Sequence, residues 1–253
     1  MIDDLHSSGD WPPGRVLVQS ATYNESENIE LLIDAVLASS PDVQLLIIDD
    51  DSPDGTGRIA FERAGREPRL HVLGRRGRRG LGSAILEGFQ LARRRGFAVS
   101  LNLDADFSHD PAEIPRLLAA LDPVGGAPKD IVIGSRRVAG GRTVGWPIAR
   151  HVASWLVCAF TRWVLGVPVM DSSGGFRAVR LSVLDRIDLG GFAQGYAFQE
   201  DFLWRVHRAG GSVVEIPITF TDRVRGTTKA DFAESKRSIG ELLHIARITW
   251  LGR

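Results

Sequence analysis

Residues 97–106 read Phe97-Ala-Val-Ser-Leu-Asn-Leu103 followed by Asp104-Ala105-Asp106, a strand-like apolar run that ends in two carboxylates on alternate positions. Asp110-Pro111 comes shortly after, and an aspartate before a proline is typical of the first turn of a helix. The carboxylate pair is therefore expected at the carboxyl end of a strand, where open α/β sheets bind ligands. Its oxygens suit Mg²⁺ or Mn²⁺, which commonly share such ligands with substrate phosphates. An isolated pair of this kind is more often a solvated acidic turn, so the surrounding motifs decide.

Outward from this stretch, strand-like and helix-like segments alternate, which predicts an α/β fold with a mostly parallel central sheet flanked by helices. Asn24 and Glu27 have the spacing of a capping box for the first helix. The expected strands cover residues 15–19, 43–48, 70–73, 97–103, 130–134 and 212–218. The expected helices cover residues 29–39, 58–66, 83–95, 148–165, 200–208 and 232–251.

The length and composition favour one domain. A chain of 253 residues that is 43% hydrophobic is long enough to bury a sizeable core, and it shows no internal repeat or low-complexity linker. Residues 1–14 are expected to form a flexible N-terminal tail, and the domain to cover residues 15–253. The acidic, polar N-terminus does not resemble a signal peptide, and no apolar run is long enough to predict a transmembrane segment.

The formal net charge is zero, so there is no general case for nucleic-acid binding. The basic charge is instead concentrated in two glycine-rich loops, which suit anionic ligands: Arg75, Arg76, Arg78 and Arg79 in the first, and Arg136, Arg137, Arg142 and Arg150 in the second. A single cysteine, Cys158, excludes an intrachain disulfide and fits a reducing compartment. No histidine and cysteine spacing suggests zinc.

Three further loops follow expected strands or open expected helices. Ala21-Thr22-Tyr23-Asn24-Glu25 offers an aromatic ring for stacking on a base and a carboxylate for a ribose, although such residues also open ordinary helices. Asp49-Asp50-Asp51 suits ribose hydroxyls or base edges, whereas Pro53-Asp54-Gly55 is ordinary turn chemistry. The turn at residues 80–84 lets the backbone approach a ligand closely, which is weak evidence when taken alone.

In this order, the motifs resemble the family 2 inverting glycosyltransferases of GT-A fold: T-Y-N-E (22–25), I-I-D-D-D-S-P-D-G-T (47–56), G-L-G-S-A (80–84) and D-A-D-F-S-H-D-P (104–111). Motifs of the second half resemble the dolichyl-phosphate (polyprenyl-phosphate) mannose synthases within that family: Gly134–Arg136, Gly140-Gly141, Gly145-Trp146 with Arg150, Asp171–Arg177 and Phe220–Lys229. The resemblance runs from about residue 15 to about residue 250. It implies transfer of mannose, with inversion, from GDP-mannose to dolichyl or polyprenyl phosphate.

The resemblance also implies site residues. Residues 15–135 are the implied nucleotide-binding half and residues 136–253 the implied acceptor-binding half. The implied nucleotide ligands are Ala21, Tyr23, Glu25, Ile47 and Asp49. Asp104 and Asp106 are implied to hold Mg²⁺ or Mn²⁺ and the donor diphosphate, with Ala105 contacting through its backbone. Four basic residues are implied at the phosphates, the acceptor and the donor–acceptor junction: Arg136, Arg150, Arg223 and Lys229.

Three positions depart from the family pattern. Ala21 stands where the family usually has proline, Asp51 replaces a usual glycine, and Ser108 occupies a position that is glutamine in some relatives, which puts its role as a third metal ligand in doubt. A lipid phosphate, whose second pKa is about 6, is largely ionised near neutral pH and needs little help from a general base. The segment Gln199-Glu200-Asp201 lies where other inverting relatives keep a base, although acids are also common at helix starts.

A lipid acceptor implies that the reaction takes place at a membrane surface. The chain is therefore expected to be cytoplasmic and peripheral to the cytoplasmic membrane face. A membrane-anchoring partner subunit is a further alternative. The candidate docking surface is the apolar helix that carries Trp155, Leu156, Phe160, Trp163 and Leu165, with Arg150 and Arg162 nearby. The same side chains would also suit a dimer contact or the domain core.

Three alternatives stay open. A polyprenyl-phosphate glucosyltransferase that uses UDP-glucose shares much of the pattern. Asp104-Ala105-Asp106-Phe107-Ser108 also mimics the nucleophile strand of D-x-D phosphatases, although that class places the pair near the first strand and here four strand–helix units precede it. The third alternative is a non-catalytic nucleotide-sensing module.

Overall fold

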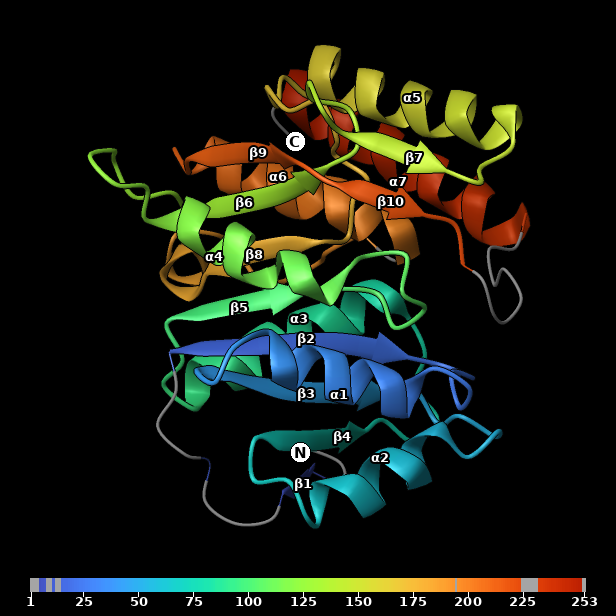
Figure 1. Cartoon of the computed structure of the whole chain (residues 1–253). Coiled ribbons are helices and arrows are strands. Elements are labelled where there is room, and N and C mark those ends of the chain that lie inside the picture. The colour runs from blue at the N-terminus through green and yellow to red at the C-terminus, as the bar shows by residue number, and fades with distance from the viewer. Residues whose placement is uncertain (1–4, 8–10, 12–14, 194, 224–231, 252–253) are drawn as a thin grey trace.

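The computed structural model describes residues 5–7, 11, 15–193, 195–223 and 232–251 (Figure 1). Its main sheet has eight strands in the order β1-β4-β3-β2-β5-β8-β6-β9. These strands are β1 (Leu5–Ser7), β2 (Val16–Thr22), β3 (Val43–Asp49), β4 (Leu70–Gly74), β5 (Val99–Asn102), β6 (Ile131–Ser135), β8 (Arg177–Arg180) and β9 (Val213–Pro217). A second, two-stranded sheet pairs β7 (Arg142–Val144) in parallel with β10 (Thr219–Thr221). The predicted α/β class with a mostly parallel central sheet is confirmed.

Seven α-helices are described: α1 (Ile29–Ser39), α2 (Thr56–Ala64), α3 (Leu81–Arg94), α4 (Ile114–Leu121), α5 (Ile148–Trp163), α6 (Phe198–Arg208) and α7 (Phe232–Leu251). Short 3₁₀ turns cover Pro111–Glu113, Leu181–Asp185 and Gly195–Ala197. The predicted bounds of α1 and α7 agree with the structure. Helix α4 had no counterpart among the ranges expected from sequence, although Asp110 was expected to cap a helix, and its side chain accepts a hydrogen bond from the Ala112 amide at 2.9 Å.

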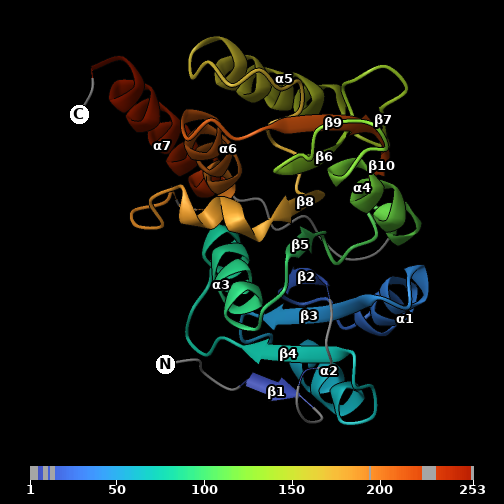
Figure 2. The same ribbon diagram turned by 90° about the vertical axis from the view of Figure 1, so that its left-hand side faces the viewer.

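Both faces of the main sheet are buried, which explains the continuous apolar run of β3. Alternate residues of a strand point to opposite faces, so Leu46 and Ile48 join the core under α3 and α6, while Leu45 and Ile47 join the core under α1, α2 and α4. Figure 2 shows α3 and α1 on opposite sides of β2 and β3.

The strand β8 was not predicted, and it changes how the two halves of the chain meet. It lies between β5 and β6 and runs antiparallel to both, with Arg177 opposite Asn102 and opposite Ile133. A segment from the second half of the chain thus completes the sheet of the first half. The halves at residues 15–135 and 136–253 are interleaved in space rather than set side by side.

Two local predictions were wrong. The expected capping box fails because Asn24 adopts a left-handed backbone conformation, with φ of 55°, and α1 begins after Asn28, which makes no side-chain cap. The N-terminal tail was expected to be flexible throughout, but Leu5–Ser7 form β1 and pair antiparallel with β4. Trp11 also stacks on His71, with ring centroids 3.6 Å apart.

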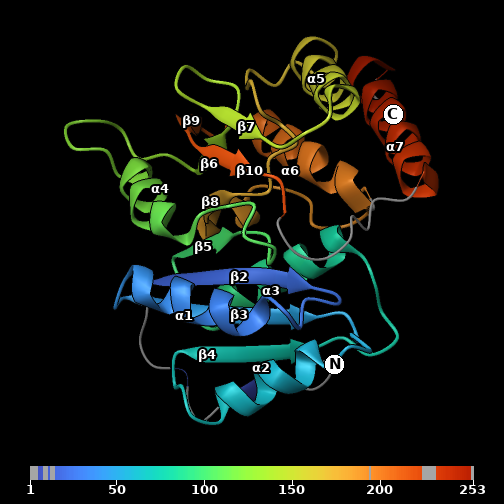
Figure 3. The ribbon, with the colours of Figure 1, turned by 45° about the vertical axis from the view of Figure 1, so that its right-hand side comes forward.

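Helices α5 and α7 lie beside one another at the end of the molecule farthest from β1 (Figure 3). The indole Nε1 of Trp250 near the end of α7 donates to the carbonyl of Val164, the residue that follows α5, at 2.9 Å. Among the described residues, no helix is both long enough and apolar enough to cross a membrane.

Candidate active site

The carboxyl ends of β2, β3, β5 and β6 point to one edge of the sheet, because these four strands run parallel or are brought into the same direction through the antiparallel β8. Polar residues occupy that edge: Thr22 and Asp49 end β2 and β3, Asp104 follows β5, and Arg136 follows β6. The sheet therefore gathers residues that are far apart in sequence at one edge, as expected for ligand sites of open α/β sheets.

Asp49 organises the part of this edge that is expected to hold a nucleotide. Its Oδ1 accepts hydrogen bonds from the hydroxyls of Thr22 at 3.2 Å and Ser52 at 2.5 Å, and its Oδ2 accepts from the Ser52 amide at 3.0 Å. A Cβ added at Gly57 would lie 2.7 Å from that Oδ2, so only glycine fits the start of α2 without displacing Asp49. Asp49 is thus a fixed carboxylate at the end of a buried strand.

The other predicted nucleotide ligands differ in access. Tyr23 is partly exposed, with the guanidinium of Arg79 4.2 Å from its ring centroid, and Glu25 accepts a hydrogen bond from Asn28 at 2.9 Å. Ala21 is partly exposed at the end of β2. Ile47 is fully buried in the core under α1, so its side chain offers no surface contact.

The carboxylate pair lies in a tight turn after β5. Asp106 Oδ1 accepts from the amide of Ser108 at 3.0 Å and from its hydroxyl at 2.6 Å, while Asp106 Oδ2 lies 3.0 Å from Arg223 Nη2. Phe107, between them, has φ of 59°, an uncommon backbone conformation for a residue with a Cβ. Turn strain of this kind often accompanies functional sites.

Asp104 is the more accessible carboxylate of the pair, with 38% of its side chain exposed, and its Oδ2 lies 3.7 Å from His109 Nδ1. Partial burial of the carboxylate raises the pKa of Asp104; His109 opposes this shift, and the neighbouring charge of Asp106 adds to it. A Cβ added at Gly175 would lie 3.2 Å from Asp104 Oδ1, so the backbone of that residue closes one side of the carboxylate.

This donor set fits a divalent cation of the Mg²⁺ or Mn²⁺ type. Two carboxylates supply hard oxygen ligands, and such ions usually complete their shell with water and substrate phosphates rather than with a full protein cage. Accordingly, within the described part of the chain, no group of three or more histidine, cysteine or acidic residues is arranged to hold a metal. Ser108, whose role as a third ligand was doubtful, uses its hydroxyl to bind Asp106.

Arg136 is held by Asp171, which opens one of the motifs of the resemblance but was not among the implied site residues. Asp171 is fully buried and accepts from the Arg136 amide at 2.8 Å, from Nε at 2.7 Å and from Nη2 at 2.5 Å. Burial alone would raise the pKa of Asp171, but the hydrogen bonds and charge of Arg136 outweigh it and lower that pKa. The Arg136 guanidinium also lies 5.0 Å from the Trp146 ring centroid.

A second network places Arg150 beside the same Trp146 ring that Arg136 contacts. Arg150 Nη1 lies 2.8 Å from Asp222 Oδ1, and its guanidinium lies 4.3 Å from the centroid of the Trp146 ring. Asp222 precedes Arg223, whose backbone amide donates to the same Oδ1 at 3.1 Å. The structure thus brings Arg136, Arg150 and Arg223 together near the carboxylate pair. Lys229 lies outside the described residues.

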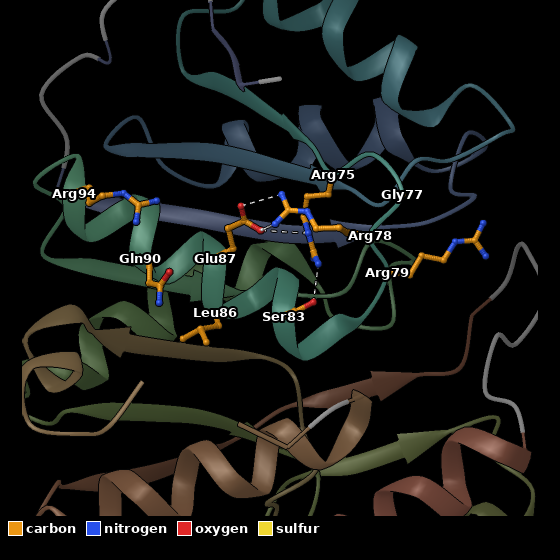
Figure 4. A pocket seen from close by; sticks show the side chains of 9 residues that line it. All are labelled: Arg75, Gly77, Arg78, Arg79, Ser83, Leu86, Glu87, Gln90 and Arg94. Atoms are coloured by element: carbon orange, nitrogen blue, oxygen red, sulfur yellow. Dashed lines mark hydrogen bonds and ion pairs between the residues drawn. The ribbon is translucent and has the colours of Figure 1, made fainter. Parts of the chain in front are cut away.

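The basic loop after β4 lines a separate hollow of about 920 Å³ along the outer face of α3 (Figure 4). Arg75 is buried there and pairs with Asp50 at 3.1 Å and with Glu87 at 3.3 Å, and Arg78 also pairs with Glu87 at 3.3 Å. Two of the four arginines expected to attract anions are therefore committed to acids of the chain, and they brace the end of β3.

Glu200, near the start of α6, was noted as a possible base, but it is 2% exposed. Its burial raises its pKa to about 7, although the charge of Arg177 opposes that shift. Arg177 is buried as well and donates to the backbone carbonyls of Gly174 at 2.7 Å, Gln199 at 2.8 Å and Ser172. Arg177 thereby ties the loop after Asp171 to α6.

The raised pKa of Glu200 predicts a pH-dependent stability. The folded state holds the Glu200 proton more tightly than the unfolded chain between pH 4.5 and about 7, so the free energy of unfolding should fall as pH rises through that window. The contribution amounts to about 3 kcal/mol at most, at 1.36 kcal/mol for each pH unit. Urea denaturation at about pH 5 and about pH 8 should show this loss in the wild type and a smaller loss in Glu200→Gln. Parallel pH profiles for the two proteins would contradict it.

Comparison with known proteins gives a consistent picture. The family described as "Glycosyl transferase family 2" matches residues 18–188. The chain is 46% identical over 220 residues to the polyprenol monophosphomannose synthase of Mycolicibacterium smegmatis, covering 86% of this chain and 82% of that protein. It is 43% identical over 216 residues to the undecaprenyl-phosphate mannosyltransferase of Micrococcus luteus, covering 85% and 87%.

Among solved structures, the fold is similar to that of glucosyl-3-phosphoglycerate synthase from Mycobacterium tuberculosis in complex with Mn²⁺, UDP and glucosyl-3-phosphoglycerate. The TM-score is 0.67 at 21% identity, covering 92% of this chain and 80% of that one. At this identity the likeness supports the fold and nothing finer.

Proposed function

The chain belongs to glycosyl transferase family 2, and from that premise we propose that it transfers mannose from GDP-mannose to a polyprenyl or dolichyl phosphate, with inversion at the sugar carbon. The observation that carries the proposal is the meeting of the carboxylate pair with two arginines: Arg223 contacts Asp106 at 3.0 Å, and the charges of Arg136 and Arg223 act on Asp104. The names of the two similar mannosyltransferases support the choice of sugar and of lipid acceptor. Family membership removes the support for the phosphatase and nucleotide-sensing alternatives.

On this proposal Tyr23, Glu25 and Asp49 bind the nucleoside, and the carboxyl edge of the sheet orients its diphosphate towards Asp104 and Asp106. These two residues would hold the divalent cation, which when bound supplies Lewis-acid stabilisation of the departing diphosphate. Asp171 fixes the direction of the Arg136 guanidinium, which adds positive charge to the same site. Fixed charges of this kind lose little free energy to reorganisation when the transition state forms.

The acceptor needs little activation. Its phosphate is mostly doubly ionised at neutral pH, since the second pKa of a phosphate ester is about 6. One phosphate oxygen attacks the anomeric carbon from the side opposite the leaving diphosphate, and this inverts the configuration. Arg150, which contacts Asp222 and Trp146, is the proposed ligand of that phosphate. Glu200 is buried, which agrees with a reaction that uses no carboxylate base.

A donor panel tests the proposal. GDP-mannose and UDP-glucose are each supplied with a polyprenyl phosphate and Mn²⁺, and the lipid product is measured. GDP-mannose should be the preferred donor by at least about tenfold, since binding discrimination of this size takes only about 1.4 kcal/mol. Equal or better turnover of UDP-glucose would assign the chain to the glucosyltransferase alternative.

We also propose that the enzyme works as a peripheral protein at the cytoplasmic face of a membrane, and that α5 is the docking surface. Three of its large apolar side chains are well exposed, namely Ile148 at 81%, Trp155 at 58% and Trp163 at 75%. The helix has no acidic residue, which suits an anionic membrane surface. Leu165, included in this surface from sequence, is buried in the core, so that part of the prediction was wrong.

Co-sedimentation with vesicles of phosphatidylglycerol tests the docking surface. Trp163→Ser should weaken vesicle binding by about tenfold, because burying a large apolar side chain contributes about 1.5–3 kcal/mol. Leu31→Ser is the matched control: Leu31 is 52% exposed on α1, on another side of the sheet, and its loss should leave binding unchanged. Absence of vesicle binding by the wild type would favour a membrane-anchoring partner subunit instead.

A further inference from the structure

The carboxylate of Asp106 already faces a cation in this structure. Its Oδ1 is engaged by both the amide and the hydroxyl of Ser108, and its Oδ2 lies 3.0 Å from Arg223 Nη2. Both side chains of the ion pair are largely enclosed, with 7% of Asp106 and 19% of Arg223 exposed. A charged hydrogen bond in such surroundings is stronger than one at an open surface.

The oxygen that Arg223 contacts is also the one best placed to bind a metal. Ser108 directs two donors at Oδ1, so a cation that binds Asp106 without breaking this turn must approach Oδ2. A guanidinium and a divalent ion cannot occupy that position together. Even a pair of unit charges 4 Å apart repels by about 4 kcal/mol at the effective dielectric near a protein surface.

The backbone next to the Arg223 side chain is anchored by hydrogen bonds. The amide of the preceding Asp222 donates to the Val144 carbonyl at 2.8 Å, which joins β10 to β7. Asp222 Oδ1 accepts from Arg150 at 2.8 Å and from the Arg223 amide at 3.1 Å. Exchange at Asp106 therefore moves the Arg223 side chain, while these backbone hydrogen bonds can stay in place.

We propose that Arg223 is an exchangeable counter-ion of Asp106, so that binding of a divalent cation and release of the Arg223 guanidinium are a single event. The inference rests on the proposed function, because the released guanidinium would then find its new partner in the donor diphosphate, with which it forms paired charged hydrogen bonds. Cation and donor consequently bind cooperatively, because the binding of each one makes the binding free energy of the other more favourable. Without a donor, Arg223 keeps the cation affinity low.

The test measures Mn²⁺ binding alone, from the paramagnetic resonance signal of free Mn²⁺, with no nucleotide and no lipid present. Arg223→Gln should bind Mn²⁺ about tenfold more tightly than the wild type, a coupling of ordinary size for two interacting sites. Arg223→Lys keeps the charge and should show a much smaller gain. Arg142→Gln is the matched control, since Arg142 lies on the neighbouring β7 and bonds Thr219 instead of Asp106.

A second variant shows where the gain arises. Adding Asp106→Asn to Arg223→Gln should abolish the tighter binding, and thermal melting of each variant verifies that it is folded. Equal Mn²⁺ affinity in the wild type and Arg223→Gln, the same gain in Arg142→Gln, or no Mn²⁺ binding by any variant would overturn the exchange. None of these outcomes depends on the sugar or the lipid, so failure here is distinguishable from failure of the donor panel.

Discussion

Asp106→Ala is expected to reduce mannosyl transfer by at least about a thousandfold, at saturating donor and in excess Mn²⁺. Asp106 contributes one of two carboxylates to the cation site, and without it the charge that develops on the leaving diphosphate is poorly compensated. A loss of several kcal/mol of transition-state stabilisation corresponds to about three orders of magnitude in rate. The variant also removes the carboxylate that Arg223 contacts. The Arg223 guanidinium cannot replace the missing cation ligand, because it carries no acceptor oxygen.

The measurement is initial rate of lipid product at increasing Mn²⁺ concentration. Asp110→Ala serves as the control, because it removes an exposed carboxylate four residues away that caps the following turn. Its loss should lower stability by about 1 kcal/mol and spare the rate. Asp104→Asn should show a smaller but large loss. Undiminished turnover of Asp106→Ala in the presence of a chelator would refute the metal role.

Asp171→Ala should lower the free energy of unfolding by about 3–5 kcal/mol, the usual cost of removing one partner of a buried ion pair. Asp171 is fully buried and accepts three hydrogen bonds from Arg136, while its own amide donates to Glu215 at 2.9 Å. Removing the carboxylate leaves the buried Arg136 guanidinium without its counter-charge. The guanidinium also loses the hydrogen bonds that fix its orientation.

Denaturation with urea measures the effect. In the double variant Asp171→Ala with Arg136→Met, part of the lost stability should return, because the unpaired charge is gone. Asp122→Ala is the control: its carboxylate is 45% exposed and pairs with Arg15 and Arg180 at the surface, so its removal should cost at most about 1 kcal/mol. Equal losses in Asp171→Ala and Asp122→Ala would contradict the special weight given to the buried pair.

Local patterning accounts for the parts of the fold that could be predicted from sequence. The run of β3 is apolar on both faces and α1 buries Ile29, Leu32, Ile33 and Val36 at helical spacing, so each element is specified within a few residues. The strand β8 escaped prediction because Arg177–Arg180 is only four residues long and owes its pairing to β5 and β6, which are distant in sequence. Strand formation of this kind depends on tertiary context more than on propensity.

In the candidate site, too, local sequence predicted some features, while contacts between distant residues could not be predicted. Acids and arginines placed directly after strands could be identified from sequence, because the carboxyl ends of parallel strands meet at one edge. Their pairing could not, since Arg136 meets Asp171 and Asp106 meets Arg223 across 35 and 117 positions of the chain. Ile47 was implied as a nucleotide ligand by its place in a motif, and the fold buries its side chain.

The late strand β8 has a consequence for how this protein is made. When residues 15–135 have left the ribosome, β5 and β6 exist as sequence, but the strand that joins them has yet to be synthesised. Two unpaired strand edges are then exposed, and such edges promote association with other chains. Productive folding must wait for Arg177–Arg180, with Asn102 pairing 75 positions along the chain, a non-local step that is intrinsically slow. Truncation after residue 135 should accordingly yield an aggregating fragment, whereas expression with a chaperone that binds nascent chains should favour the full-length protein.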